Sequence, residues 1–240
     1  MQHAVDAGAT REVIVADDTD VLLLLLYFKA DIDATVLLIS GKKVYDISKI
    51  RDSRSENILN NILGWHAITG YDTTSSFSGI GKKTALDIYV KHPELLSGIG
   101  RGTSFEKVEE FVCKMYDTQF SAVEEARVSL YENKAKNLCS LPPTRDALHY
   151  HYIRVNYQCK IWLNANRIYM AENPEETGAW VDKNGKLVPH YKDKTDFPDY
   201  DELNSCKCIK GCKAGCRCKK RGRCMKSCFC KGECCHAHTD

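Results

Sequence analysis

Ten of the 13 cysteines lie within residues 206–240, and this clustering constrains the chain more than any other feature. The spacing of the third, fourth and fifth tail cysteines recurs twelve residues on, in the sixth, seventh and eighth. The segment has hardly any large apolar residue, so burial alone cannot fold it. Metal binding can supply the missing free energy in segments of this kind.

Three chemistries remain open for these cysteines. A disulfide framework needs an oxidising compartment, and residues 1–10 lack the basic flank and apolar core of a secretory signal. Iron–sulfur ligation uses fewer cysteines at other spacings. Structural zinc is favoured, and nine thiolates bind about three tetrahedral ions if three of the thiolates bridge.

Charge divides the chain in the same way. Residues 206–240 carry a formal charge of +8, whereas residues 1–205 carry −6. Binding of zinc by thiolates leaves the tail positive, and such a patch suits phosphate contacts that carry little sequence information. We therefore expect the tail to contact the DNA backbone through Lys219, Lys220, Arg221 and Arg223. A zinc-stapled protein-interaction module is the alternative.

Strand and helix patterns alternate over the first part of the chain. Residues 12–16 predict a buried strand, residues 21–28 a short buried helix, and residues 34–40 and 44–47 a strand hairpin. The pattern is helical from residue 55 to about 131. Apolar spacing predicts a further helix through residues 148–162 after Pro142-Pro143, and Asn184-Gly185 predicts a hairpin turn.

Three aspartates, Asp17, Asp18 and Asp20, follow the first predicted strand. The carboxyl edge of a parallel sheet is where ligands bind in open α/β folds. Clustered carboxylates suit a hard cation such as Mg²⁺ or Mn²⁺. A solvated turn followed by a helix cap remains the alternative.

A glycine-rich corner follows Gly70-Tyr-Asp72. Gly79-Ile-Gly81 allows a tight turn, and the next helix would begin with outward-facing N–H groups beside Lys82 and Lys83. Free N–H groups at a helix start bind phosphate. A plain helix–turn–helix corner is the alternative.

The order of these elements resembles the later half of the flap-endonuclease-like nucleases, within the PIN-like group. The resemblance implies that Asp18, Asp20 and Asp72 are metal-binding residues. It also implies that Gly79, Gly81, Lys82 and Lys83 grip the DNA backbone. In that family further acidic ligands come from upstream elements, and two-metal hydrolysis needs them. We expect this chain to hold an incomplete nuclease-like domain.

The tail resembles the tesmin-type CXC domain, which implies a three-zinc, nine-cysteine cluster. The ligands that this resemblance implies are Cys206, Cys208, Cys212, Cys216, Cys218, Cys224, Cys228, Cys230 and Cys234. The stretches His66-Ala-Ile-Thr-Gly-Tyr-Asp-Thr-Thr-Ser and Leu141-Pro-Pro-Thr-Arg-Asp-Ala-Leu-His resemble transposon-associated animal proteins that also end in cysteine-rich tails. The CXC family often reads DNA with a tyrosine near its repeat. No tyrosine follows Tyr200 here, so backbone binding is the expectation.

These observations predict an α/β fold: a partial PIN-like parallel sheet, a helical hairpin region and a small zinc-stapled C-terminal module. The expected boundaries are residues 1–140 for the nuclease-like domain, 141–204 for a helix, hairpin and acidic linker, and 205–235 for the zinc module. Cys113, Cys139 and Cys159 are expected in the core. His149 and His151, two apart on a helix, should not share a face.

The predicted function is nucleic-acid binding without turnover, with DNA as partner and a nuclear, intracellular location. A divalent-metal-dependent DNA endonuclease is the main alternative. The longest apolar run, eight residues from Val21 to Phe28, is shorter than the roughly 20 that a membrane helix needs, so no membrane partner is expected.

Overall fold

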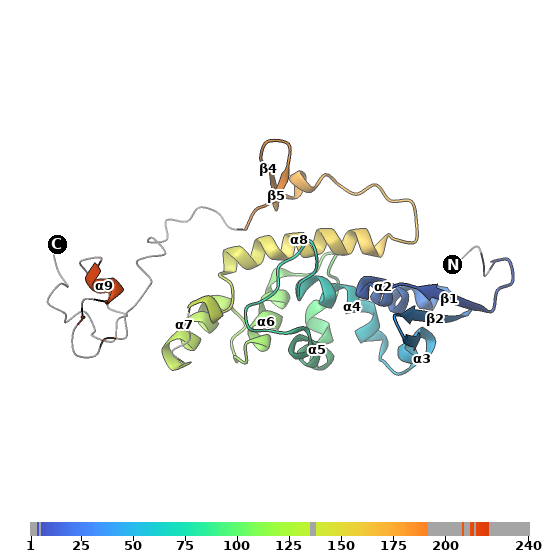
Figure 1. The fold of residues 1–240 in the computed structure, drawn as a ribbon, viewed down its shortest axis with the longest axis horizontal. Coiled ribbons are helices and arrows are strands. Elements are labelled where there is room, and N and C mark those ends of the chain that lie inside the picture. Colours follow the sequence, from blue (N-terminus) through green and yellow to red (C-terminus); the bar gives the residue numbers. More distant parts are fainter. Residues whose placement is uncertain are drawn as a thin grey trace. The chain divides into compact units, whose positions relative to one another are not determined.

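The computed structural model describes residues 4, 6–134, 138–191, 208, 212, 213 and 215–220. The chain divides into two compact units, residues 1–192 and 193–240. Figure 1 labels the α-helices and most of the strands. The elements are β1 (Arg11–Val15), α2 (Thr19–Phe28), η1 (Lys29–Asp31), β2 (Thr35–Ser40), β3 (Lys43–Asp46), α3 (Ile47–Asp52), α4 (Glu56–Ile68), α5 (Lys82–Lys91), η2 (Pro93–Leu96), α6 (Phe105–Met115), α7 (Val123–Lys134), η3 (Leu138–Ser140), α8 (Arg145–Leu163), η4 (Pro174–Thr177), β4 (Trp180–Asp182), β5 (Leu187–Pro189) and α9 (Arg217–Lys220).

A three-stranded sheet of order β1-β2-β3 begins the first unit. β1 runs parallel to β2, with Val13 opposite Leu37, and β2 runs antiparallel to β3, with Ile39 opposite Val44. The crossover from β1 to β2 contains α2, as a parallel connection requires. The structure is therefore mixed α/β, and it confirms the predicted strand, helix and hairpin of residues 12–47.

Among the residues that the structure describes, the sheet is covered on one face only. Val36 and Leu38 of β2 are fully buried and belong to the core that includes residues of α2. Val13 and Val15, on the other face of β1, are 53% and 77% exposed. The expectation of a buried first strand is therefore wrong for these residues, because β1 lies at the sheet edge and its outer face is uncovered in the structure.

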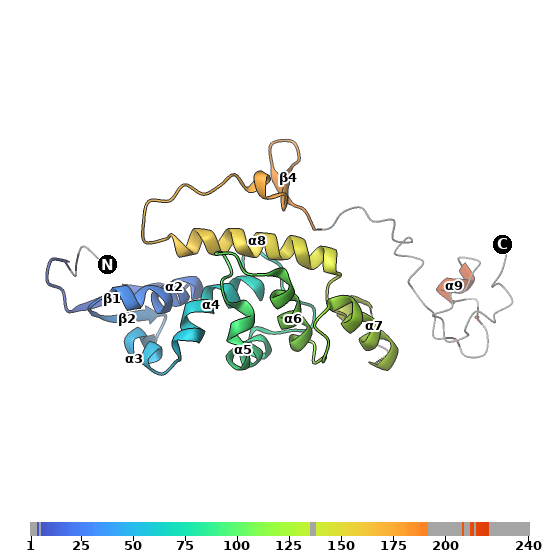
Figure 2. The same cartoon turned by 180° about the vertical axis from the view of Figure 1, so that it is seen from behind.

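Helices make up most of the remainder, and α8 lies along α4 and α6 in both views (Figures 1 and 2). The predicted helix is confirmed: α8 begins after Pro142-Pro143, where the hydroxyl of Thr144 accepts a hydrogen bond from the Ala147 N–H at 3.3 Å. Its buried apolar residues Leu148, Val155 and Cys159 face the core. None of the described helices is long and apolar enough to cross a membrane.

Two of the three cysteines expected in the core are there. Cys113 and Cys159 are buried, whereas Cys139 is exposed. The prediction fails for Cys139 because the residue lies in η3, a short turn that joins α7 to α8.

The second hairpin forms as its sequence predicts. β4 and β5 pair antiparallel, with Val181 opposite Val188. Asn184 and Gly185 adopt φ angles of 58° and 77°. Positive φ at both central residues is the turn geometry that matches the twist of paired strands.

The two histidines near the start of α8 have different environments, as their spacing predicts. His149 is exposed and packs edge-on against Phe105. His151 is buried, and its Nε2 lies 2.9 Å from the carbonyl oxygen of Ile68, the last residue of α4. Burial lowers the pKa of His151 from 6.5 to about 4, so the ring is neutral in the folded protein at neutral pH.

Acid should therefore destabilise the first unit. The unfolded chain binds a proton at His151 below pH 6.5 and the folded chain does not until about pH 4, so stability is lost as pH falls through that window. We expect the His151 contribution to unfolding free energy to fall by about 2 kcal/mol from pH 7 to pH 5.

Urea titrations at both pH values, followed by tryptophan fluorescence, measure this effect, since all three tryptophans lie in the first unit. A His151→Asn variant should lose about 2 kcal/mol of the pH dependence. The matched variant His149→Asn should keep it. Equal pH dependence in both variants would contradict the assignment.

Candidate functional site

The acidic stretch after β1 has structural partners. The carboxylate of Asp17 accepts hydrogen bonds from the Gly41 N–H at 2.7 Å and the Ser40 hydroxyl at 3.2 Å. Asp18 caps α2 and accepts from the Asp20 N–H at 2.9 Å. These two side chains thus stabilise the β2–β3 turn and the helix start, as the turn-and-cap interpretation predicts.

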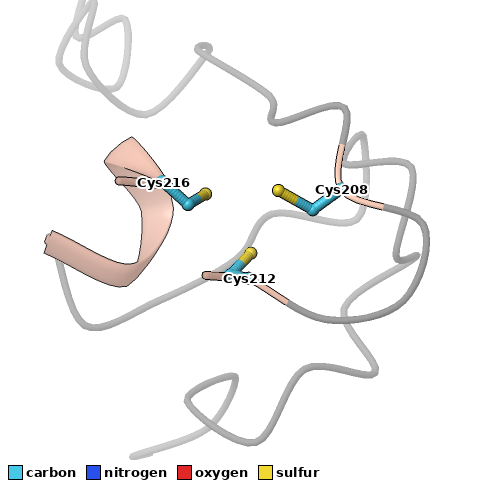
Figure 3. Close-up of side chains that lie close together, drawn as sticks. All are labelled: Cys208, Cys212 and Cys216. Atoms are coloured by element: carbon cyan, nitrogen blue, oxygen red, sulfur yellow. The ribbon is translucent and has the colours of Figure 1, made fainter. Parts of the chain in front are cut away.

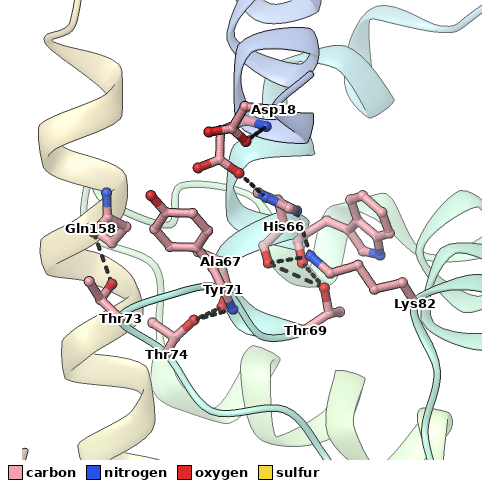
Figure 4. Close-up of polar contacts among 11 residues, drawn as sticks. Asp18, His66, Ala67, Thr69, Tyr71, Thr73, Thr74, Lys82 and Gln158 are labelled. Carbon is pink, nitrogen blue, oxygen red and sulfur yellow. Dashed lines mark hydrogen bonds and ion pairs between the residues drawn. The ribbon is translucent and has the colours of Figure 1, made fainter. Parts of the chain in front are cut away.

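Asp20 lies at the first turn of α2 and reaches His66 of α4. Figure 4 shows Lys82 beside the same histidine. Oδ1 of Asp20 is 2.7 Å from Nε2 of His66, and Nδ1 of the same ring is 2.6 Å from Nζ of Lys82. An ammonium group only donates, so Nδ1 must accept from Lys82 and Nε2 must carry the proton donated to Asp20. The three side chains form one relay across α2, α4 and α5.

Burial governs the protonation of this relay. The pKa of His66 is lowered, chiefly by burial against an opposing contribution from Asp20. The pKa of Lys82 is also lowered by burial, which Asp20 opposes. Neutral His66 is the form that the relay requires.

The relay stands at the C-terminus of α4, where four carbonyl groups have no partner within the helix. The carbonyl of Trp65 accepts from the Thr69 hydroxyl at 2.8 Å, and that of Ala67 accepts from the Thr74 hydroxyl at 2.7 Å. Nζ of Lys82 donates both to the ring of His66 and, at 3.5 Å, to the backbone carbonyl of His66. Nε2 of His151 donates to the fourth carbonyl, that of Ile68, at 2.9 Å. All four carbonyl groups at the end of α4 are therefore hydrogen-bonded.

The segment after α4 folds back closely upon itself. Gly70 has a φ of 104°, and a Cβ there would lie 2.9 Å from the Cβ of Ser76. Glycine is therefore required at this position by both conformation and space. The turn places Tyr71 beside His66, at 5.7 Å between ring centroids, and Trp162 of α8 stacks on the same histidine at 5.6 Å.

The three predicted metal-binding aspartates all influence Tyr71, but their ligand atoms do not form one close group. Burial, and next the Asp20 carboxylate, raises the pKa of Tyr71 to about 12, and Asp72 and Asp18 contribute to the same effect. The three carboxylates therefore all disfavour the loss of the Tyr71 hydroxyl proton. Within the described part of the chain, however, Asp18, Asp20 and Asp72 do not form a set whose ligand atoms all lie within 4.8 Å of one another.

The glycine corner has the predicted local structure. Gly79 adopts a φ of 72°, Gly81 caps α5 without a side-chain hydrogen bond, and Ala85 is buried where the helix packs. Lys83 is exposed. Lys82 is also exposed, and its ammonium group is hydrogen-bonded to Nδ1 of His66 at 2.6 Å.

The described part of the tail brings three cysteines together (Figure 3). The Sγ atoms of Cys208, Cys212 and Cys216 all lie within 4.8 Å of one another. Cys218 is buried and is not one of this group. The other expected ligands and tail cations lie outside the described residues, namely Cys206, Cys224, Cys228, Cys230, Cys234, Arg221 and Arg223.

Cys216 has the properties of a metal ligand. Its pKa is lowered to about 6, first by the backbone N–H of Lys219 and also by the thiols of Cys212 and Cys208. The thiolate is the form that binds metal. Three sulfur donors at this separation could hold a metal ion, and the soft donor set is compatible with zinc.

Sequence reasoning did not assign roles to His66 or Tyr71. A signal was present: His66 is a polar residue at the end of the apolar run Ile62-Leu-Gly-Trp65, where a helix face is buried. A buried histidine needs hydrogen-bond partners. Which partners it finds depends on elements far away in the sequence.

No family model, curated protein or solved structure matches this chain.

Proposed function

We propose that this protein binds structural zinc through its cysteine-rich C-terminus and uses the cations of that segment to bind the DNA backbone, next to a PIN-like domain without turnover. The convergence of Cys208, Cys212 and Cys216 carries the proposal. A DNA partner implies a nuclear location.

The donor geometry supports zinc. Tetrahedral zinc binds sulfur at about 2.3 Å, which separates neighbouring sulfur atoms by about 3.8 Å. The three Sγ atoms already lie within 4.8 Å of one another, so small side-chain movements would close the site. With the nine cysteines of the CXC-like pattern, a cluster of about three ions uses all of them when three thiolates bridge.

Charge supports the nucleic-acid partner. Lys219 and Lys220 are exposed on α9, directly after the cluster residue Cys216. An ion held by Cys216 would therefore order the backbone that presents these two lysines. Arg221 and Arg223 continue the same basic run in the sequence.

The arrangement of the aspartates supports binding rather than turnover. Asp20 is committed to His66, and Asp18 caps α2. A two-metal hydrolase needs carboxylates that hold two ions about 3.5–4 Å apart. Freeing Asp20 for a metal ion would leave the buried His66 N–H without its acceptor.

Zinc content tests the first part of the proposal. Elemental analysis of the purified chain should find about three zinc ions per molecule. A Cys212→Ser variant should lose zinc, while Cys139→Ser, which alters an exposed cysteine of the first unit, should retain it. Since protons compete for thiolates, zinc should also be released as pH falls from 7 to 5. Zinc below one ion per chain with reduced cysteines would refute this assignment.

Salt-dependent DNA binding tests the second part. Each phosphate contact on duplex DNA contributes about −0.9 to the slope of log affinity against log salt. Reversing the charges of Lys219, Lys220, Arg221 and Arg223 should flatten that slope by up to about 3.6. The control reverses four exposed lysines of the first unit, Lys42, Lys43, Lys183 and Lys186, for the same change in net charge. Equal slopes in both variants would favour the protein-interaction alternative.

A cleavage assay separates the proposal from the endonuclease alternative. With Mn²⁺ and flap, hairpin or single-stranded DNA, we expect no turnover, because Asp20 is held by His66. Asp72→Asn is the most informative variant, since Asp72 is exposed and its change should leave folding intact. Robust cleavage that Asp72→Asn abolishes would establish the enzyme instead.

A further inference from the structure

A cavity of about 210 Å³ lies in the first unit, and none of the three relay residues lines it. Residues 75–78 after α4, the end of α6 and the first half of α8 line it. Its lining includes Phe77, Ala147, His151 and Arg154. At roughly 30 Å³ per water molecule, the space equals about seven waters, enough for a small organic molecule.

A buried cation lines this cavity. Arg154 is 2% exposed, one of its N–H groups donates to the His190 carbonyl, and its guanidinium lies 5.1 Å from the Tyr191 ring centroid. Within the described residues no carboxylate pairs with it. A guanidinium presents five N–H donors, and a buried charge without a counter-charge is costly. An anionic group bound in the cavity would supply a counter-charge for the Arg154 guanidinium.

A buried acceptor lines the same cavity. Nε2 of His151 donates to the Ile68 carbonyl, so the neutral ring leaves Nδ1 as a lone-pair acceptor. Nδ1 is buried and has no hydrogen-bond partner in the structure. His151 and Arg154 are three apart on α8 and therefore share one face. A ligand that donates to Nδ1 of His151 while it accepts from Arg154 would therefore satisfy both groups.

The remaining residues of the cavity wall indicate what kind of molecule would fill it. Phe77, Leu141, Pro143 and Ala147 provide apolar surface, and three serines add adaptable hydroxyl groups. A bare inorganic ion would leave the apolar wall unused. An organic acid with an apolar body would fill it.

We propose that this cavity binds a small organic hydroxy acid, with its carboxylate on Arg154, its hydroxyl donating to Nδ1 of His151 and its apolar body against Phe77. The proposal is independent of the zinc and DNA function. It concerns different residues and requires no metal.

Three probes of the same shape test each part of this recognition by calorimetric titration of the full chain. Mandelate carries the carboxylate and the hydroxyl, phenylacetate lacks the hydroxyl, and mandelamide lacks the charge. We expect saturable mandelate binding with a dissociation constant in the millimolar range, as suits so small a ligand. The other two probes should bind at least about tenfold more weakly, because each leaves a buried group unpaired.

Two variants locate the binding. Ala147→Leu fills the cavity and should abolish mandelate binding, and Arg154→Gln should abolish the preference for mandelate over mandelamide. Lys160→Gln removes a cation of α8 outside this lining and should bind mandelate as the unmodified chain does. Circular dichroism confirms the fold of each variant, and Ala147→Leu keeps the test valid if Arg154→Gln unfolds.

The proposal would be overturned if mandelate showed no saturable binding up to about 10 mM. This limit follows from the affinity expected of so small a probe. Equal binding of mandelamide, or mandelate binding unchanged in a folded Ala147→Leu variant, would also overturn the proposal.

Discussion

The buried C-terminus of α4 is the point on which the first unit depends. A helix end leaves carbonyl groups that must find donors when water is excluded. Here the donors come from four other places in the chain: Thr69, Thr74, Lys82 and His151. These contacts tie α5, α8 and the segment after α4 to a single helix end, and Figure 4 shows those of Thr69, Thr74 and Lys82. The positions of the cavity and of the aspartates follow from that arrangement.

The same helix end decides what the aspartates can do. Because His66 lies in the last turn of α4, its ring must be paired, and Asp20 and Lys82 supply the pairs. The pairing with His66 favours a structural role for Asp20, although this residue resembles a nuclease ligand in the sequence. Lys82 is likewise a partner of the helix end, and both Lys82 and Lys83 are exposed at the corner.

The second unit follows a different physical rule. Its described residues offer few apolar contacts, and its order would come from metal–sulfur bonds. Hydrogen bonds from nearby backbone N–H groups and from the thiols of Cys212 and Cys208 lower the pKa of Cys216, so several groups already stabilise one thiolate. A cluster that organises such a segment would also fix the positions of its cations. Metal binding and contact with a polyanion would then be coupled within one short stretch of chain.

Local pattern was sufficient for much of the fold. The strand before the aspartates, the Asn184-Gly185 hairpin and the helix after Pro142-Pro143 all form as predicted, because periodicity and turn chemistry act between near neighbours in the sequence. The grouping of Cys208, Cys212 and Cys216 also follows from short spacing.

Tertiary structure decided what depends on distant partners. Val15 is exposed because the sheet is covered on one face, which the alternation of strand residues does not reveal. The pairing of Asp20 with His66 and the burial of Arg154 join residues from separate helices, and a buried polar group takes whichever partner the packing brings. The sequence by itself determined the elements and the cysteine cluster; only the packed structure decided which polar side chains face one another.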